Sequence, residues 1–474
     1  MPPSFPVPEG LTYFPFQEEG IYFALQHSGT LLADEMGLGK SVQAIGIVNA
    51  LANPERILIV CPATMRLVWK RELEKWLLHP CTLGIVGIDA SALNARIIIC
   101  NYDRLNQVRS FLLGRKWDLA IYDECHFLKN PVARRSMIAL SIKAERRLCL
   151  SGTPLQNRPM ELFGILSWLD PKTWPPQSRW TFGHRYCGAK YNGFGWDFLG
   201  STPANLPELS QRLRASVMLR RTKAQVLPEL PSKFRSVVEL EATTNIRASV
   251  EAELSAFERW MEAKAKSESD SIKREGQYRA GVRDLQRFAG IEHETLAEAR
   301  HAVALAKVPL VAEFVREGLQ SGGKIVLFCH HRDVVFAYLE ALAEFYPVSI
   351  TGATNPSDRQ LAIDHFQTKP DCRIFVGNIV AAGTGITLAP ASNHCIFAEL
   401  SFVPAQMSRA EDRLHRIGAL NNVLIQHLVL AGSVDALMAH ILVRKQKILD
   451  AVLDEKSDHK NVACSFTPAM TTTL

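Results

Sequence analysis

The chain has 474 residues, 47% of them hydrophobic, which is long enough for two or three domains with sizeable cores. It carries 54 Lys and Arg against 48 Asp and Glu, and this net charge of +6 is compatible with a nucleic-acid partner without requiring one. No apolar run reaches the roughly 18 residues of a membrane helix, and the first residues lack a signal-peptide pattern, so we expect an intracellular protein with no membrane partner. The ten cysteines contain no Cys-x-x-Cys pair, which favours buried thiols over disulfides or a zinc site.

A phosphate-binding loop is predicted near the N-terminus. The apolar run Thr30–Ala33 enters a glycine-bearing turn that ends in Lys40 and Ser41, and an apolar-periodic helix pattern follows. In such a strand–loop–helix unit the backbone amides face the nucleotide phosphates, the lysine offsets their charge and the serine hydroxyl ligates Mg²⁺. The usual pattern has a glycine where this chain has Asp34, so the segment alone is also compatible with a chance glycine-rich turn. The residues predicted to bind the nucleotide here are Glu35, Met36, Gly37, Leu38, Gly39, Lys40 and Ser41.

Two adjacent carboxylates follow the next strongly apolar strand pattern, Asp118–Tyr122. We expect Asp123 to hold Mg²⁺ and Glu124 to polarise the attacking water of a hydrolysis reaction. An isolated Asp-Glu pair is also compatible with a solvated acidic turn, but the upstream loop favours the catalytic interpretation. A further short strand leads into Ser151–Pro154, whose hydroxyl groups can link nucleotide state to movement of the second half of the chain.

The second half carries its own nucleotide signature. A glycine-bearing segment, Ala382–Ile386, includes Gly385, which we expect to contact the nucleotide. Further on, Arg413 and Arg416 are three residues apart and would share one face of a helix. Two guanidinium groups on one face suit the charge that develops on a γ-phosphate, which is the arginine-finger role. A charged, solvated helix is the alternative explanation of this pattern.

The order of strand and helix patterns predicts two parallel sheets covered on both faces. In each half, five short apolar runs alternate with helical patterns, and every motif follows a strand, where open α/β sheets bind ligands. The expected strands are Leu31–Ala33, Ile57–Val60, Ile97–Cys100, Leu119–Tyr122 and Leu148–Leu150, then Lys324–Phe328, Val348–Ile350, Ile374–Val376, Cys395–Ala398 and Val423–Val429. We expect ATP to bind between Lys40 of one lobe and Arg413 and Arg416 of the other.

The domain boundaries follow from stretches without strand signals. We expect an N-terminal lobe over residues 1–230 with a helical protrusion from 159, and a C-terminal lobe over residues 231–455. The second lobe would carry a helical protrusion at 245–308 and a final bracing helix at 436–455, and residues 456–474 are expected to be a disordered tail. Trp196 in the first protrusion is either a core anchor, which we favour, or an aromatic side chain that stacks at a DNA junction.

The ordered motifs resemble those of the Swi/Snf ATPases, helicase-like DNA translocases of helicase superfamily two. The matching segments, which span most of the chain, are Pro15–Gln17, Ala33–Ser41, Val60–Ala63, Asp123–His126, Ser151–Leu155, Met218–Arg221 and Glu411–Gly418. The Asp34 that departs from the general phosphate-loop pattern is typical of this family. The resemblance implies two RecA-like parallel-sheet lobes with helical protrusions, with ATP and DNA bound at the cleft between the lobes.

The resemblance also implies contacts to adenine and to DNA. Gln17 matches the adenine-recognition position of the family, and its amide can both donate to and accept from the base edge. The cofactors are then ATP and Mg²⁺, and a neighbouring aromatic side chain can stack on the base. The positions that match the family's DNA phosphate contacts are Thr64, Arg66, Asn101, Tyr102, His330, Gly352, Arg359 and Thr384. Such contacts set register on DNA without reading its sequence.

Within the family, Arg185–Lys190, Gly195–Asp197 and Val217–Lys233 resemble the HARP-like annealing-helicase branch. We therefore expect a DNA-dependent ATPase that moves on duplex or forked DNA, with strand annealing, branch migration or fork remodelling as the result. A strand-separating DNA or RNA helicase and a remodeller that displaces a protein from DNA are the alternatives. We expect a monomer that binds DNA and leave a protein partner open, in the nucleoid of a bacterial or phage-infected cell or in the nucleus of a eukaryotic one.

Overall fold

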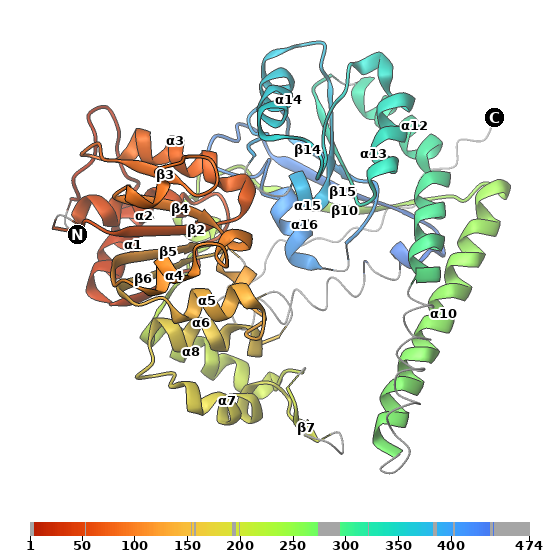
Figure 1. The fold of residues 1–474 in the computed structure, drawn as a ribbon. Helices are drawn as coiled ribbons and strands as arrows, with labels where there is room; N and C mark the ends of the chain where they lie inside the picture. Colours follow the sequence, from red (N-terminus) through yellow and green to blue (C-terminus); the bar gives the residue numbers. More distant parts are fainter. Residues whose placement is uncertain are drawn as a thin grey trace. The chain divides into compact units, whose positions relative to one another are not determined.

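The computed structural model describes residues 4–52, 54–152, 154–155, 158–191, 196–198, 200–273, 294–320, 322–382, 386–401, 403–436 and 439. Within these ranges the chain forms two compact units (Figure 1). Unit 1 contains the described residues of 4–189 and 198–230, and unit 2 contains 190–191, 196–197 and the described residues from 231 onward. The bracing helix and tail predicted after residue 436 lie outside the described residues, apart from 436 and 439.

Unit 1 is built on a seven-stranded parallel sheet with the strand order β3-β4-β2-β5-β6-β1-β9. Its strands are β1 (Gly29–Leu32), β2 (Ile57–Cys61), β3 (Leu83–Ile85), β4 (Ile97–Asn101), β5 (Trp117–Asp123), β6 (Ala144–Leu150) and β9 (Met218–Leu219). Its helices are α1 (Pro15–Gln26), α2 (Lys40–Ala50), α3 (Arg66–Trp76), α4 (Arg109–Leu113), α5 (Arg134–Ser141), α6 (Met160–Leu169), α7 (Arg179–Tyr186), α8 (Leu206–Ser216) and α9 (Lys223–Val226).

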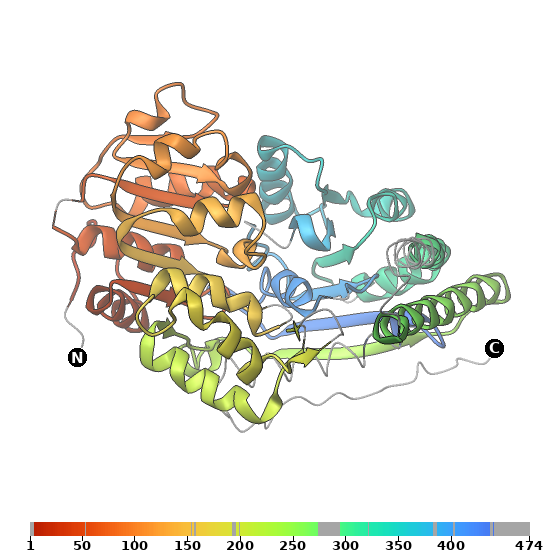
Figure 2. The same cartoon turned by 60° about the horizontal axis from the view of Figure 1, so that its bottom comes forward.

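Helices cover both faces of this sheet. Alternate strand residues point to opposite faces, and because both sets are apolar, both faces must be buried. Leu58 and Val60 belong to a core formed with α4–α8, whereas Ile57 and Ile59 belong to a core formed with α1–α3. In Figure 2 the yellow to yellow-green helices of residues 160–216 gather on one side of the sheet. Leu32 of β1 pairs with Leu150 of β6 on one side and with Leu219 of β9 on the other. The residues after β9 are therefore neighbours of the phosphate loop that follows β1.

Unit 2 contains a six-stranded parallel sheet with the order β10-β15-β14-β11-β13-β12. Its strands are β10 (Lys233–Leu240), β11 (Ile325–Cys329), β12 (Val348–Ile350), β13 (Ile374–Asn378), β14 (His394–Phe397) and β15 (Val423–Leu430), and its helices are α10 (Thr244–Lys273), α12 (Val308–Gln320), α13 (Arg332–Ala341), α14 (Pro356–Thr368), α15 (Ile379–Ala382) and α16 (Pro404–Glu411). Val326 and Phe328 pack with α14–α16, and Ile325 and Leu327 pack with α12 and α13.

The prediction of two parallel sheets with helices on both faces is confirmed. Three strands of the two parallel sheets were not predicted: the three-residue β3 and the two-residue β9 are short, and β10 is a charged, partly exposed strand at the sheet edge. The stretch 159–217, for which no strand was predicted, contains an antiparallel pair, β7 (Lys190–Tyr191) and β8 (Trp196–Asp197). In the described part of the chain, no helix combines the length and the apolar character that a membrane crossing needs.

Candidate nucleotide site

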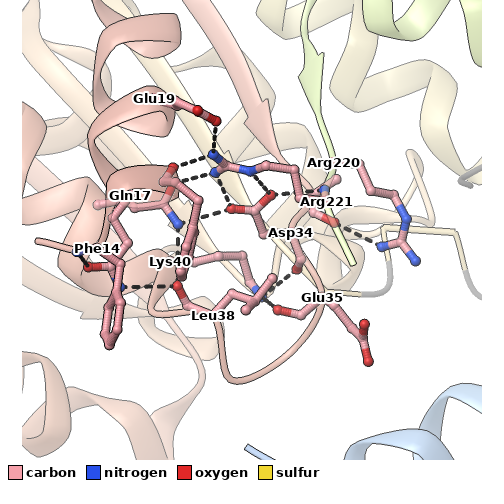
Figure 3. Close-up of polar contacts among 12 residues, drawn as sticks. Phe14, Gln17, Glu19, Asp34, Glu35, Leu38, Lys40, Arg220 and Arg221 are labelled. Atoms are coloured by element: carbon pink, nitrogen blue, oxygen red, sulfur yellow. Dashed lines mark hydrogen bonds and ion pairs between the residues drawn. The ribbon is translucent and has the colours of Figure 1, made fainter. Parts of the chain in front are cut away.

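The phosphate loop connects β1 to α2 with backbone geometry that depends on glycine. Gly37 and Gly39 have φ angles of 86° and 74°, in the left-handed region that other residues adopt only with strain. A Cβ atom at Gly39 would lie 2.4 Å from the Gln17 amide nitrogen, so a side chain there would have to displace the Gln17 amide. The Lys40 ammonium donates to the backbone carbonyls of Asp34 (2.7 Å) and Glu35 (3.2 Å), as Figure 3 shows. The loop therefore curves around the Lys40 ammonium. Burial lowers the pKa of Lys40 despite the nearby carboxylates.

Asp34, which replaces the usual first glycine of the loop, forms a buried ion pair with Arg221. The Asp34 side chain is fully buried, and Arg221 donates to it through Nη2 at 2.6 Å and Nε at 3.1 Å (Figure 3). The Arg221 backbone amide and the Gln43 amide group also donate to Asp34, at 3.1 Å and 3.0 Å. The same guanidinium reaches α1, where it donates to the Phe16 carbonyl and lies 3.3 Å from a Glu19 oxygen.

Two neighbours of Arg221 also support the phosphate loop. Arg220 donates to the carbonyl of Ala33 (2.8 Å) and to that of Gly152 (3.2 Å). The Lys223 amide donates to the Glu35 carboxylate at 2.8 Å, and its ammonium lies 3.7 Å from the other carboxylate oxygen. Residues 220–223 therefore hold the loop from the side of β9, a role that the sequence did not reveal. The Met218–Arg221 segment was the available signal, but Arg221 and Asp34 are 187 residues apart and nothing in the sequence pairs them.

Gln17 lies beside the loop, as its predicted adenine role requires, although its amide has structural partners in this state. Its Oε1 accepts from the Phe14 amide at 3.1 Å, which caps α1, and its Nε2 donates to the Leu38 carbonyl at 3.3 Å (Figure 3). Each amide atom retains one further hydrogen-bonding position. Of the adjacent aromatic residues, Tyr13 is buried against Trp76, whereas Phe14 is 42% exposed and is the ring available to stack on a base.

The two predicted catalytic carboxylates lie at the carboxyl end of β5. Asp123 accepts from the Trp69 indole N–H (2.8 Å) and from the Glu124 amide (2.9 Å). Burial, reinforced by the Glu124 charge, raises the pKa of Asp123 to about 7. Glu124 has φ 50° and ψ 50°, and a left-handed conformation of this kind costs a non-glycine residue on the order of 1 kcal/mol. Its carboxylate lies 3.2 Å from His126 Nδ1 and accepts from Ser151 at 3.4 Å, which connects the two carboxylates to the segment after β6.

These residues fit Mg²⁺ bound together with a nucleotide. Mg²⁺ takes one or two carboxylates plus phosphate oxygens and water, and Asp123, close enough to Lys40 to interact with its charge, can supply a carboxylate in its ionised form. Ser41, the second residue of α2, follows Lys40 and supplies the hydroxyl on the loop side. Among the described side chains, no group of three His, Cys, Asp or Glu could hold a metal without such help.

In unit 2 the two arginines converge, but not on a helix. The prediction that Arg413 and Arg416 share a helix face is wrong, because α16 ends at Glu411 and both arginines lie in the turns that follow. Beyond the helix end, the amides of Leu388 and Ala389 donate to the Arg413 carbonyl, at 2.9 Å and 3.1 Å, and hold the turn in place. Both guanidiniums nevertheless donate to the Ile386 carbonyl, Arg413 at 3.1 Å and Arg416 at 3.4 Å. Arg416 also donates to the Thr387 hydroxyl at 2.7 Å. Gly385 lies outside the described residues.

The predicted DNA positions differ in how accessible they are. Thr64 and Gly352 are exposed, and Arg66 and His330 are partly exposed, whereas Thr384 lies outside the described residues. Arg359 is partly exposed and donates to the Ala381 carbonyl at 2.7 Å.

Tyr102 and Asn101 need correction as side-chain contacts to DNA. Tyr102 is 1% exposed and donates to the Asp123 carbonyl at 2.7 Å, so its ring braces the catalytic strand. Asn101, at the end of β4, is 5% exposed. Strand ends hold core side chains as readily as surface ones, and the sequence does not separate the two.

The favoured interpretation of Trp196 as a core residue is also wrong. Trp196 is 42% exposed and packs edge-on against Tyr191, which is 62% exposed, across the β7–β8 pair. Trp180 and Trp196 are the exposed tryptophans among the residues that the structure describes. The second strand continues into Phe198, which contacts Trp180 and His184 of α7. Phe198, not Trp196, therefore anchors this segment.

The fold and the site define a P-loop nucleotide-binding protein with two parallel-sheet units. A family model described as the SNF2-related domain matches residues 16–279, more than half of the chain, and one described as the helicase conserved C-terminal domain matches residues 306–418. The chain belongs to the SNF2-related family, and the resemblance stated from the motifs is confirmed.

Two curated relatives show the extent of the similarity. The human DNA annealing helicase and endonuclease ZRANB3 is 33% identical over 464 residues, which cover 94% of this chain and 40% of that protein. The Xenopus tropicalis SWI/SNF-related matrix-associated actin-dependent regulator of chromatin subfamily A-like protein 1 is 34% identical over 449 residues, which cover 93% of this chain and 45% of that protein. The chain thus spans less than half the length of these relatives. A solved structure titled Sulfolobus solfataricus SWI2/SNF2 ATPase core in complex with dsDNA is 22% identical, with a TM-score of 0.45 and coverage of 96% of this chain and 94% of that one.

Proposed function

We propose that this chain is an ATP-dependent DNA translocase that moves on double-stranded or forked DNA, with strand annealing, branch migration or fork remodelling as the result. The observation that carries the proposal is the buried Lys40, Asp123 and Glu124 group of unit 1 in a chain that also brings Arg413 and Arg416 to one carbonyl in unit 2. Membership of the SNF2-related family supports the ATPase, and the name of the human relative supports annealing.

The proposed reaction assigns a separate task to each group. Lys40 exchanges its bonds to the loop carbonyls for bonds to phosphate oxygens of ATP, with Gln17 and Phe14 at the base. Glu124 orients and accepts a proton from the attacking water, and Arg413 and Arg416 stabilise the charge on the transferred phosphoryl group. Mg²⁺, held by Ser41 and Asp123, neutralises phosphate charge when it is bound. DNA would be held through its phosphates by Thr64, Arg66, His330, Gly352 and Thr384, so we place the protein with DNA in the nucleoid or nucleus.

The test is the steady-state ATPase rate measured without nucleic acid and then with single-stranded DNA, blunt duplex, forked DNA and RNA. We expect duplex or forked DNA to stimulate turnover most strongly, and Lys40→Ala to abolish turnover while DNA binding remains. Lys116→Ala, which removes an exposed lysine paired with Glu145, is the matched control and should behave as wild type. Stimulation by single strands or RNA alone would replace the proposal with a strand-separating helicase.

A remodeller that displaces a protein from DNA would use the same motor. Displacement of a protein roadblock from duplex DNA without branch migration of a synthetic fork would favour that function. Fork regression by the wild type, absent in Lys40→Ala, would favour the annealing function.

A further inference from the structure

The segment that connects the two units is ion-paired at both ends to nucleotide motifs. Unit 1 ends at residue 230 and unit 2 resumes at 231. Before this boundary Arg221 binds Asp34 of the phosphate loop, and after it Arg235 binds Glu411, the residue at which α16 ends. Each of these pairs lies within a single unit.

At the second end, several groups hold the arginine motif from the connecting segment. Arg235 donates to Glu411 through Nη2 at 2.6 Å and Nε at 3.0 Å, a two-pronged geometry that fixes orientation. Lys233 lies 2.9 Å from Glu411 and 3.7 Å from Asp412. His415 Nε2 donates to the Pro231 carbonyl at 2.8 Å. Burial alone would raise the pKa of Glu411, but the Arg235 and Lys233 charges outweigh burial and hold it well below its usual range.

The residues that the connecting segment contacts in unit 2 are immediate neighbours of Arg413 and Arg416, the two candidate arginine fingers. Glu411, Asp412 and His415 flank Arg413 and Arg416 in the sequence, and Arg413 donates to the carbonyl of Arg409 one turn earlier. At the other end, Asp34 and Glu35 supply the carbonyls that hold Lys40. A displacement of either ion pair therefore moves a group that would contact phosphate.

We propose that residues 220–235 mechanically couple the phosphate loop to the arginine motif, with Arg221 and Arg235 as positioning residues. This inference rests on the proposed ATPase function. The connecting stretch from Lys223 to Pro231 is hydrogen-bonded to the phosphate loop at one end and to the arginine motif at the other, so a displacement of either motif acts directly on this stretch. ATP binding at the loop then changes the positions of Arg413 and Arg416 through the connecting chain. In the other direction, changes that DNA causes in unit 2 alter the position of Lys40.

A double-mutant cycle tests this coupling. Arg221→Lys and Arg235→Lys keep each charge but lose the planar two-pronged contact, so both variants should fold. We expect each to lower kcat, and the double variant to retain a kcat at least about threefold above the product of the two single effects. The shifts in melting temperature should simply add, because the two pairs lie in separate cores. A purely structural role predicts additivity in kcat as well and would refute the coupling.

A second cycle supplies the control and separates this inference from the function on which it rests. Arg316 pairs with Glu344 at 2.8 Å in unit 2, away from the arginine motif, so Arg221→Lys with Arg316→Lys should show additive kcat effects. The affinity of each variant for a fluorescent ATP analogue gives a cycle that needs no turnover. Absence of turnover in the wild type would refute the proposed function, and the binding cycle would then decide the coupling by itself, with additivity overturning it.

Discussion

In unit 1 the arginine beside the phosphate loop is bonded to a buried carboxylate, whereas in unit 2 the hydrogen bonds that bring the two motif arginines together go to a neutral carbonyl. Arg221 is neutralised by Asp34, which is fully buried. Arg413 and Arg416 instead share the Ile386 carbonyl, and Arg416 adds the Thr387 hydroxyl. A carboxylate adds the attraction of an opposite charge to the hydrogen bond, which a neutral carbonyl does not supply.

Under the proposed function, this difference separates a structural arginine, Arg221, from the two arginines that would act on the substrate. A guanidinium on a buried carboxylate is not available to a ligand, because leaving would expose an uncompensated charge. A guanidinium on a carbonyl can exchange that neutral partner for a phosphate oxygen and gain strength. The same side chain therefore shapes the loop in one unit and would act on the substrate in the other.

The largest effect on kcat is expected from substitution of Arg413 or Arg416, the two arginines bonded to the Ile386 carbonyl. Arg416→Ala should lower kcat by about 10³-fold with little change in ATP affinity, because an arginine finger acts in the transition state. Single-turnover hydrolysis and equilibrium binding of nucleotide measure the two quantities. Arg373→Ala is the matched control, since this arginine also bonds backbone carbonyls of unit 2, those of Gly323 and Leu319, away from the motif. An equal loss of affinity and kcat in Arg416→Ala would contradict the finger role.

The buried ion pair between Asp34 and Arg221 should contribute measurably to the free energy of unfolding. Arg221→Met leaves Asp34 charged and buried, which is expected to lower the free energy of unfolding by about 3–5 kcal/mol. The double variant Asp34→Leu with Arg221→Met should recover most of that stability but not nucleotide affinity. Arg235→Met should cost less, since the Arg235 side chain is 38% exposed where that of Arg221 is 10% exposed. Denaturant unfolding of the three variants decides between a scaffold role and a ligand role.

The carboxylates of unit 1 predict a pH dependence. Burial raises the pKa of Asp123 from 3.8 to about 7, so the folded state keeps a proton that the unfolded state has lost, and stability falls as pH rises from about 4 to about 7. Binding of Mg²⁺ with nucleotide requires the carboxylate, so its affinity should fall below pH 7, approaching about tenfold per pH unit. Nucleotide binding measured in excess EDTA provides the control and should lack this slope. In thermal melts, Asp123→Asn should remove the stability loss that Asp123 causes between about pH 4 and pH 7.

The smallest effect is expected outside both sites. If the exposed Trp196 stacks on an unpaired base, Trp196→Ala should weaken forked-DNA binding by about fivefold and leave blunt-duplex binding unchanged. Phe336→Ala removes a comparably exposed ring, 48% accessible on α13, and is the control for general loss of apolar surface. Fluorescence anisotropy on the two DNAs measures the difference. Equal weakening of binding to forked and to blunt DNA would show that the Trp196 and Tyr191 rings stabilise the protein and do not contact an unpaired base.

The two units also differ in how well sequence reasoning described them. Lys40, Asp123 and Glu124 lie next to glycines and apolar strands that set their positions, so local pattern was sufficient to place them at strand ends. Arg413 and Arg416 were predicted to be close for the wrong reason, because their convergence depends on a carbonyl 27 and 30 residues away rather than on a helix. Tyr102 and Trp196 were assigned the wrong environments because an aromatic residue at a strand end carries no mark of which way it faces.

The amino-acid sequence by itself determined the parallel-sheet fold, the phosphate loop, the acidic pair and the family. These are local patterns, and glycine, lysine and adjacent carboxylates have few alternative uses at such spacings. Only the tertiary structure decided the partner of Asp34, the turns that carry the motif arginines and the ion pairs at both ends of the connecting segment. These contacts join residues far apart in the chain, and their energies depend on burial and on the direction of a guanidinium, which only the packed fold defines.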